Sequence, residues 1–81
     1  MNVRLLLFAS VRDLAGCDVL DFDLPAGSTI GELRRELVTR LPELAAISPH
    51  LMFAVDTEYA TDATAIGPAA EVACIPPVSG G

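Results

Sequence analysis

Hydrophobic and polar residues alternate with the period of β-strands in several short segments of the chain. Residues 2–9 are apolar on both faces, whereas residues 18–24 place Leu20, Phe22 and Leu24 on one face. A strand that is apolar on both faces is typical of the middle of a sheet, and one-sided alternation is typical of a half-buried antiparallel strand. The remaining strand-like segments are residues 51–55, 58–60 and 71–75. The pattern predicts a sheet of four or five strands.

Residues 30–41 have helical periodicity instead. Thr29 and Glu32 form a capping-box pattern in front of this segment, and Pro42 ends it. The apolar positions recur three and four residues apart, at Ile30, Leu33, Leu37, Val38 and Leu41. This is the one strong helix of the sequence, and its apolar stripe is expected to pack across the sheet.

Two shorter connections also carry local signals. Ser10 is a suitable N-cap for a short helix over residues 11–15, and Gly16 suits the left-handed position that ends it. The segment from Pro42 to His50 is irregular, with at most one helical turn near residues 43–47. Asp56-Thr57 is expected to form a tight turn between two strands.

The order of these elements predicts the fold. The first and last strands are the most apolar, so they are expected to lie side by side in the centre, parallel because the helix is part of the crossover between them. This is an α+β fold of the ubiquitin-like β-grasp type, a mixed four- to five-stranded sheet crossed by one main helix. We expect residues 1–75 to form the domain and residues 76–81 to form a protruding tail.

Composition and charge exclude several functions. The 81 residues carry a net charge of −6, with five arginines and no lysine, and such an acidic chain without a basic stripe is a poor binder of nucleic acid. No apolar run approaches the roughly 20 residues that cross a bilayer, so we expect a cytoplasmic protein. Cys17, Cys74 and His50 have no metal-ligand spacing. Cys74 is expected to be a small buried apolar residue.

The sequence contains no set of residues typical of an autonomous enzyme. It has no Ser/His/Asp constellation and no glycine-rich phosphate loop. What remains is the end of the chain, where two prolines precede Gly80 and Gly81. Glycine can enter a narrow slot that a side chain would block, and the group presented there would be the Gly81 carboxylate. The alternative is a frayed terminus with chance glycines.

Four segments resemble the small subunit of molybdopterin synthase, a family of ubiquitin-like sulfur carriers. Residues 8–13 (Phe-Ala-Ser-Val-Arg-Asp) resemble the family's opening stretch, Thr29-Ile30 with Leu33 its helix start, and residues 54–56 its Ala-Val-Asn turn. Residues 71–81, ending in Pro-Pro-Val-Ser-Gly-Gly, resemble its ending and are the most specific of the four. The resemblance covers the whole chain in order and spacing.

The resemblance implies a role in building the molybdenum cofactor. A ubiquitin-activating-like enzyme would use ATP to adenylate the Gly81 carboxylate, and a sulfur donor enzyme would convert it to a thiocarboxylate. The tail would then enter a pocket of the large synthase subunit, where sulfur passes to cyclic pyranopterin monophosphate to form the molybdopterin dithiolene. The chain would bind no cofactor permanently and would not be catalytic alone. The family assembles as a heterotetramer with a central dimer of large subunits.

Strand parity suggests which residues would meet the partner. If Leu5 and its alternate neighbours face the helix, Leu6 and Phe8 face outward, with Arg12 at the rim. Parity alone leaves open the alternative that Phe8 belongs to the core. Gly80 would pass through the narrow slot that leads to the reactive site of the partner. The other partner-binding candidates are Tyr59, Ile75, Pro76, Pro77, Val78 and Ser79.

Three other functions stay open on the sequence. The sulfur carrier of thiamine thiazole synthesis has the same fold and the same Gly-Gly end. A ubiquitin-like protein modifier would be joined through Gly81 to lysines of its targets. A plain interaction module would need neither terminal glycine, so deletion of Gly80 and Gly81 separates it from the carriers.

Overall fold

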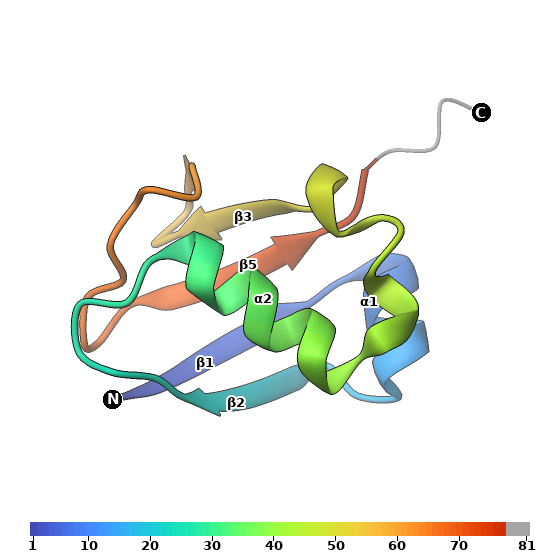
Figure 1. Cartoon of the computed structure of the whole chain (residues 1–81), viewed down its shortest axis with the longest axis horizontal. Helices are drawn as coiled ribbons and strands as arrows, with labels where there is room; N and C mark the ends of the chain where they lie inside the picture. Colours follow the sequence, from blue (N-terminus) through green and yellow to red (C-terminus); the bar gives the residue numbers. More distant parts are fainter. Residues whose placement is uncertain (78–81) are drawn as a thin grey trace.

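A computed structural model describes residues 1–77 of the chain, and within them a single mixed sheet is crossed by one long helix (Figure 1). The five strands are β1 (Asn2–Leu7), β2 (Val19–Asp23), β3 (Met52–Val55), β4 (Glu58–Ala60) and β5 (Glu71–Ile75). The helices are α1 (Ala9–Ala15) and α2 (Ile30–Arg40), followed by the short 3₁₀ turns η1 (Pro42–Leu44) and η2 (Ser48–His50).

The strand order is β2-β1-β5-β3-β4, with the most apolar strands in the centre. β1 and β5 are parallel, as predicted, because α2 lies in the connection between them. The other three neighbouring pairs, β1 with β2, β3 with β5 and β3 with β4, are antiparallel. The predicted α+β, β-grasp arrangement is confirmed, with five strands in the described part of the chain.

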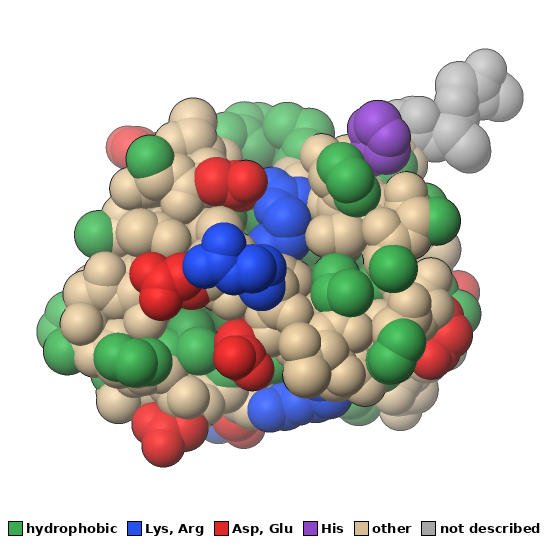
Figure 2. All heavy atoms as spheres, in the orientation of Figure 1, with side chains coloured by type: hydrophobic (Ala, Val, Ile, Leu, Met, Phe, Trp, Pro, Cys, Tyr) green, Lys and Arg blue, Asp and Glu red, His purple; other side chains and the backbone are tan. Residues whose placement is uncertain are grey.

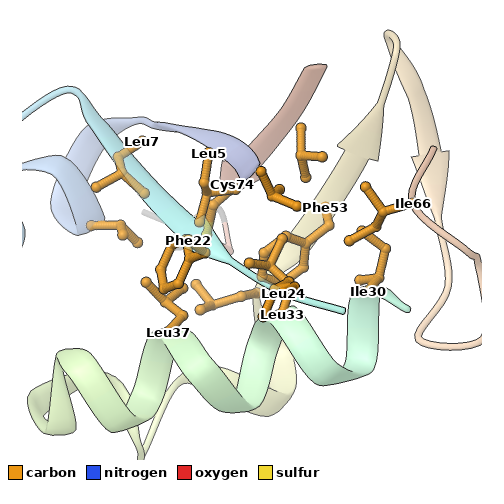
Figure 3. Close-up of a cluster of buried hydrophobic side chains, with 14 of the residues drawn as sticks. Leu5, Leu7, Phe22, Leu24, Ile30, Leu33, Leu37, Phe53, Ile66 and Cys74 are labelled. Atoms are coloured by element: carbon orange, nitrogen blue, oxygen red, sulfur yellow. The ribbon is translucent and has the colours of Figure 1, made fainter. Parts of the chain in front are cut away.

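The core lies between α2 and one face of the sheet (Figure 3). Val3, Leu5 and Leu7 of β1 are at most 2 % exposed, so the predicted inward face of this strand is confirmed. They meet Phe22 of β2 and, from α2, Leu33, which is fully buried. Fully burying one such side chain stabilises the fold by about 1.5–3 kcal/mol. Six more core residues follow the predicted spacing: Leu24, Ile30, Leu37, Phe53, Val72 and Cys74. The core also contains Val11, Leu44, Leu51 and Ile66. Val38, which was expected in the apolar stripe of α2, is only half-buried and is not part of the core, because it lies on the side of the helix turned away from the sheet.

The ends of the two helices test the capping predictions. The capping box of α2 is present: the Glu32 N–H donates to Thr29 Oγ1 at 3.3 Å, and the Thr29 N–H donates to Glu32 Oε1 at 3.2 Å. Gly16 ends α1 with φ 75°, as predicted. The prediction that Ser10 caps α1 is wrong, because the helix already begins at Ala9, whose φ of 51° turns the chain directly after Phe8.

The segment between α2 and β3 also differs from the expectation. In place of one helical turn at residues 43–47, it forms the two 3₁₀ turns η1 and η2, each with a proline in its first turn. Proline fits there because the first turn of a helix needs no N–H donor. Arg34 of α2 holds this segment: its Nη1 donates to the Leu51 carbonyl at 2.9 Å and to the Ser48 carbonyl.

No helix within residues 1–77 combines the length and the apolar character needed to cross a membrane.

The β3–β4 turn predicts a stabilising substitution. Asp56 and Thr57 have φ values of 48° and 71°, the left-handed region that disfavours a β-branched residue. We expect Thr57→Gly to raise the free energy of unfolding by about 0.5–1 kcal/mol, because relief of this strain exceeds the entropy that glycine adds to the unfolded chain. Urea denaturation measures the change. Ala63→Gly, at an exposed loop position without positive φ, should lower stability instead. Equal effects of the two substitutions would contradict the argument.

Candidate functional site

The face of the sheet that points away from α2 carries a continuous apolar surface. Strand register brings its members together: Leu6 of β1 pairs with Ala73 of β5, which pairs with Ala54 of β3, and Met52 of β3 pairs with Ile75. Tyr59 of β4 continues the row as the partner of Ala54. We call this surface the open face and define it as Leu6, Phe8, Met52, Ala54, Tyr59, Ala73 and Ile75.

Three large side chains of the open face are exposed, whereas Ala54 in its middle is only 9 % exposed. Phe8 is 45 % exposed, Met52 46 % and Tyr59 70 %, which makes them three of the four large hydrophobic residues exposed among those the structure describes. An exposed apolar cluster rimmed by polar groups is typical of a protein–protein interaction site. The alternative that Phe8 belongs to the core is therefore wrong.

Charged residues occupy the far end of the same face. On β1, Asn2 and Arg4 point outward, and Arg4 Nε lies 3.5 Å from Asp21 Oδ1 of β2. Glu71 of β5 pairs with Arg4 in the strand register. The face thus has an apolar end and a charged end, as expected of an interface core with a polar rim.

The apolar end of the open face is also where the last strand ends. β5 is parallel to β1, and Cys74 pairs with Leu7, so Ile75 ends beside Phe8 (Figure 1). Pro76 follows half-buried, and Pro77 is exposed. Because proline fixes φ near −65°, this pair stiffens the chain as it leaves the sheet. Pro77, the last residue that the structure describes, thus leaves the sheet at the apolar end of the open face.

The structure places most of the predicted partner-binding residues together. Phe8, Tyr59 and Ile75 belong to the open face. Arg12 lies in α1, the helix that begins directly after Phe8, and its side chain is 51 % exposed. Arg12 Nε lies 3.9 Å from Asp18 Oδ1 and 4.0 Å from Asp13 Oδ1, which are weak surface pairs. Predictions for Val78, Ser79, Gly80 and Gly81 lie outside the described residues.

Met52 and Ala54 are members of the open face that sequence reasoning missed. The signal was present in the segment of residues 51–55. Once Phe53 is assigned to the core, parity sends its two neighbours to the opposite face.

The one histidine and the two cysteines of the chain lie outside the open face. Within residues 1–77 no three His, Cys, Asp or Glu side chains lie together in a way that could hold a metal ion. His50 is exposed on η2. Burial raises the pKa of the Cys74 thiol to about 12, which keeps it protonated and unreactive at neutral pH.

Burial of Cys74 predicts a loss of stability in alkali. The folded thiol has a pKa of about 12 against an ordinary value of 9.0, so above pH 9 the unfolded chain loses a proton that the folded chain keeps. The stabilising contribution is complete below pH 9 and is lost as the pH rises toward 12. We expect the free energy of unfolding to fall by on the order of 1 kcal/mol more in the parent than in Cys74→Ala between pH 8 and pH 10. Urea denaturation at both pH values measures this, and parallel slopes would contradict it.

Together, the sheet order and the open face define a ubiquitin-like β-grasp domain with an apolar surface on the sheet face opposite α2. The model of the ThiS family matches residues 5–81, and the chain belongs to this family. The resemblance that residues 8–13, 54–56 and 71–81 indicated is confirmed by the relatives that follow.

The similar proteins include sulfur carrier subunits and a protein modifier. The molybdopterin synthase sulfur carrier subunit of Arabidopsis thaliana is 37 % identical over 81 residues, covering 100 % of this chain and 84 % of that protein. Small archaeal modifier protein 1 of Haloferax volcanii is 27 % identical with a TM-score of 0.85, covering 100 % of both chains. A chain from the complex of subunits 1 and 2 of the Helicobacter pylori molybdopterin-converting factor has a TM-score of 0.68 at 17 % identity, covers 100 % of both chains, and shows the fold alone.

Proposed function

We propose that this chain is a sulfur carrier subunit of molybdopterin synthase that carries its sulfur as a thiocarboxylate on Gly81. The observation that carries the proposal is the similarity over the full chain to relatives of that name, 37 % identical in the case of Arabidopsis thaliana. The arrangement of the domain supports it. It has an apolar sheet face that could meet a partner, and its last strand leads toward the Gly-Gly end.

The chemistry needs two other proteins before the carrier is loaded. A carboxylate is a poor electrophile, so an activating enzyme would join Gly81 to the AMP part of ATP and release pyrophosphate. A sulfur donor enzyme would then supply the sulfur that displaces AMP and leaves the thiocarboxylate. This chain contributes the carboxylate and a surface by which the enzymes hold it.

The large synthase subunit is the proposed partner whose pocket receives the end of the chain. The open face is the proposed surface on which it docks. A complex between the two subunits of the Helicobacter pylori factor, a structure of the same fold, supports this partner. Four residues follow Pro77, and a chain of four residues spans at most about 14 Å. The acceptor pocket must therefore lie close to the docked end of the sheet, which is where Phe8, Met52 and Ile75 gather. There sulfur would pass to cyclic pyranopterin monophosphate, and the heterotetramer follows if large subunits pair.

Intact mass spectrometry tests the proposal. The chain is produced with its activating enzyme, ATP and a sulfur source, and we expect its mass to rise by the exchange of one oxygen for one sulfur. Fragmentation should place the change on Gly81. Adding the large subunit and cyclic pyranopterin monophosphate should return the original mass while molybdopterin forms. ATP consumption without a mass change would overturn the sulfur-carrier proposal.

Protein modification is the second candidate, favoured by the fold it shares with small archaeal modifier protein 1. It would join the Gly81 carboxylate to a lysine amine of a target. Capture of a tagged chain under denaturing conditions would then yield covalent conjugates with a Gly-Gly remnant on lysine. The carrier of thiamine thiazole synthesis is a third candidate, and product formation with the molybdopterin synthase large subunit separates it from the first.

A further inference from the structure

A groove of about 400 Å³ runs along the solvent side of α2, on the side of the domain away from the open face. One wall is α2 itself, with Arg35, Val38 and Thr39, and the other is the η1–η2 segment, with Ala45 and Pro49. Arg34 and Ser48 complete the lining. Figure 2 shows this side of the molecule, with arginine side chains over α2 in the middle of the view, acidic side chains around them and apolar side chains to their right.

The two arginines of the groove differ in what they already bind. Arg34 has its side chain only 18 % exposed, and its guanidinium is fully engaged. Its Nη1 donates to two carbonyls of the η2 region, and its Nε and Nη2 both donate to Asp62 Oδ1, at 3.1 and 2.8 Å. Arg34 therefore fixes the floor of the groove and has little capacity left for a ligand.

Arg35 is the arginine without a partner. Within residues 1–77, its guanidinium makes no hydrogen bond and no ion pair, whereas each of the other arginines is held by a carboxylate or a carbonyl. Arg40, for comparison, donates to the Asp21 carbonyl at 2.8 Å and stacks 4.1 Å above the Phe22 ring. In a chain of net charge −6, the groove thus has at its rim the one arginine left uncommitted in the described part of the chain.

The rest of the groove is apolar. Val38 lies three residues after Arg35, so the two side chains share a face of α2. Ala45 and Pro49 form the facing wall without a charge. Thr39 Oγ1 donates to the Arg35 carbonyl at 3.0 Å and is already occupied. An apolar bed with one cation at its edge is complementary to an aliphatic side chain that has a carboxylate close to it in sequence.

We propose that this groove is a second docking site, for an acidic-aliphatic segment of a partner protein. The aliphatic side chain lies between Val38 and Pro49, and the neighbouring carboxylate pairs with Arg35. The surrounding surface charge is mostly negative, but charges are screened beyond about 8–10 Å at physiological salt, so the contact with Arg35 decides where the carboxylate sits. Because the groove and the open face lie on opposite sides, both can be occupied at once.

Binding of capped peptides, followed through the amide resonances of the chain, tests this site. The probe is acetyl-Leu-Asp-Leu-Glu-amide, and its matched control is acetyl-Leu-Asn-Leu-Gln-amide. We expect the acidic peptide to bind with a dissociation constant between about 0.1 and 1 mM, that is, about −4 to −5.5 kcal/mol. The shifted resonances should be those of α2 and residues 45–49, and the amide peptide should bind at least tenfold more weakly.

Charge substitutions make the test specific. Arg35→Glu should abolish the resonance shifts, and Arg35→Lys should weaken binding about threefold, because the charge stays but the planar fork is lost. Arg4→Glu makes the same charge change on the other side of the domain and should leave binding unchanged. Equal binding of both peptides, shifts confined to the open face, no binding at millimolar peptide, or an unaffected Arg35→Glu chain would each overturn the proposal. The peptide experiment involves no sulfur chemistry, so its result is independent of whether the proposed function is correct.

Discussion

A chain that lacks Gly80 and Gly81 is expected to bind the large synthase subunit and yet to form no molybdopterin. Under the proposed function, deletion removes the atom that carries sulfur, so the loss of product is complete. Binding should stay within about tenfold of the parent, or 1.4 kcal/mol, because the open face supplies most of the contact. The measurements are molybdopterin formation in the reconstituted synthase and calorimetric titration of the large subunit.

Gly80→Ala is the matched variant for this deletion, since it keeps the Gly81 carboxylate and adds one β-carbon. We expect it to slow sulfur loading by about 10²-fold, because a displacement of about 1 Å at a reacting group can have that effect. Product formation by the deleted chain would contradict Gly81 as the sulfur carrier. Loss of large-subunit binding along with product would show instead that the last two residues are part of the docking surface.

The sequence predicted the fold because its signals are local and strong. The two-sided apolar pattern of residues 2–9 and 71–75 placed β1 and β5 in the centre, and the capping box of Thr29 and Glu32 located the start of α2. The prediction that Ser10 caps α1 failed for a physical reason. A side-chain cap competes with backbone geometry, and here the left-handed turn at Ala9 started the helix before the cap was reached.

The candidate site was predicted only in part. Alternation separates the two faces of a strand but does not say which one is buried, so the exposure of Phe8 followed only when Leu5 and Leu7 were seen under α2. The open face as a surface depends on register across three strand pairs, and register is a tertiary property. The groove beside Arg35 was beyond sequence reasoning altogether, since it joins α2 to a segment without a periodic pattern.

Ala73→Arg is expected to leave the fold intact and to weaken binding of the large subunit at least 100-fold. Ala73 lies in the middle of the open face, paired with Leu6 on one side and Ala54 on the other. Its side chain points away from the core, so a longer side chain there adds no strain inside the domain. In the complex, however, a guanidinium at this point would lie among apolar groups without a partner. Burying an unpaired charge in an interface costs about 2–5 kcal/mol, and 100-fold corresponds to about 2.7 kcal/mol.

Glu71→Arg is the control, because it introduces the same side chain on the same strand and the same face, two residues earlier. Glu71 belongs to the charged end, opposite Arg4, where an added charge stays in water. We expect its affinity for the large subunit to change by no more than about threefold, as is usual for charges at an interface rim. Titration calorimetry compares the two variants, and urea denaturation confirms that both are folded. If both variants bind as the parent does, the large subunit docks elsewhere. If Glu71→Arg, which raises the net charge by two, weakens binding as much as or more than Ala73→Arg, which raises it by one, net charge governs binding and the apolar end of the open face does not.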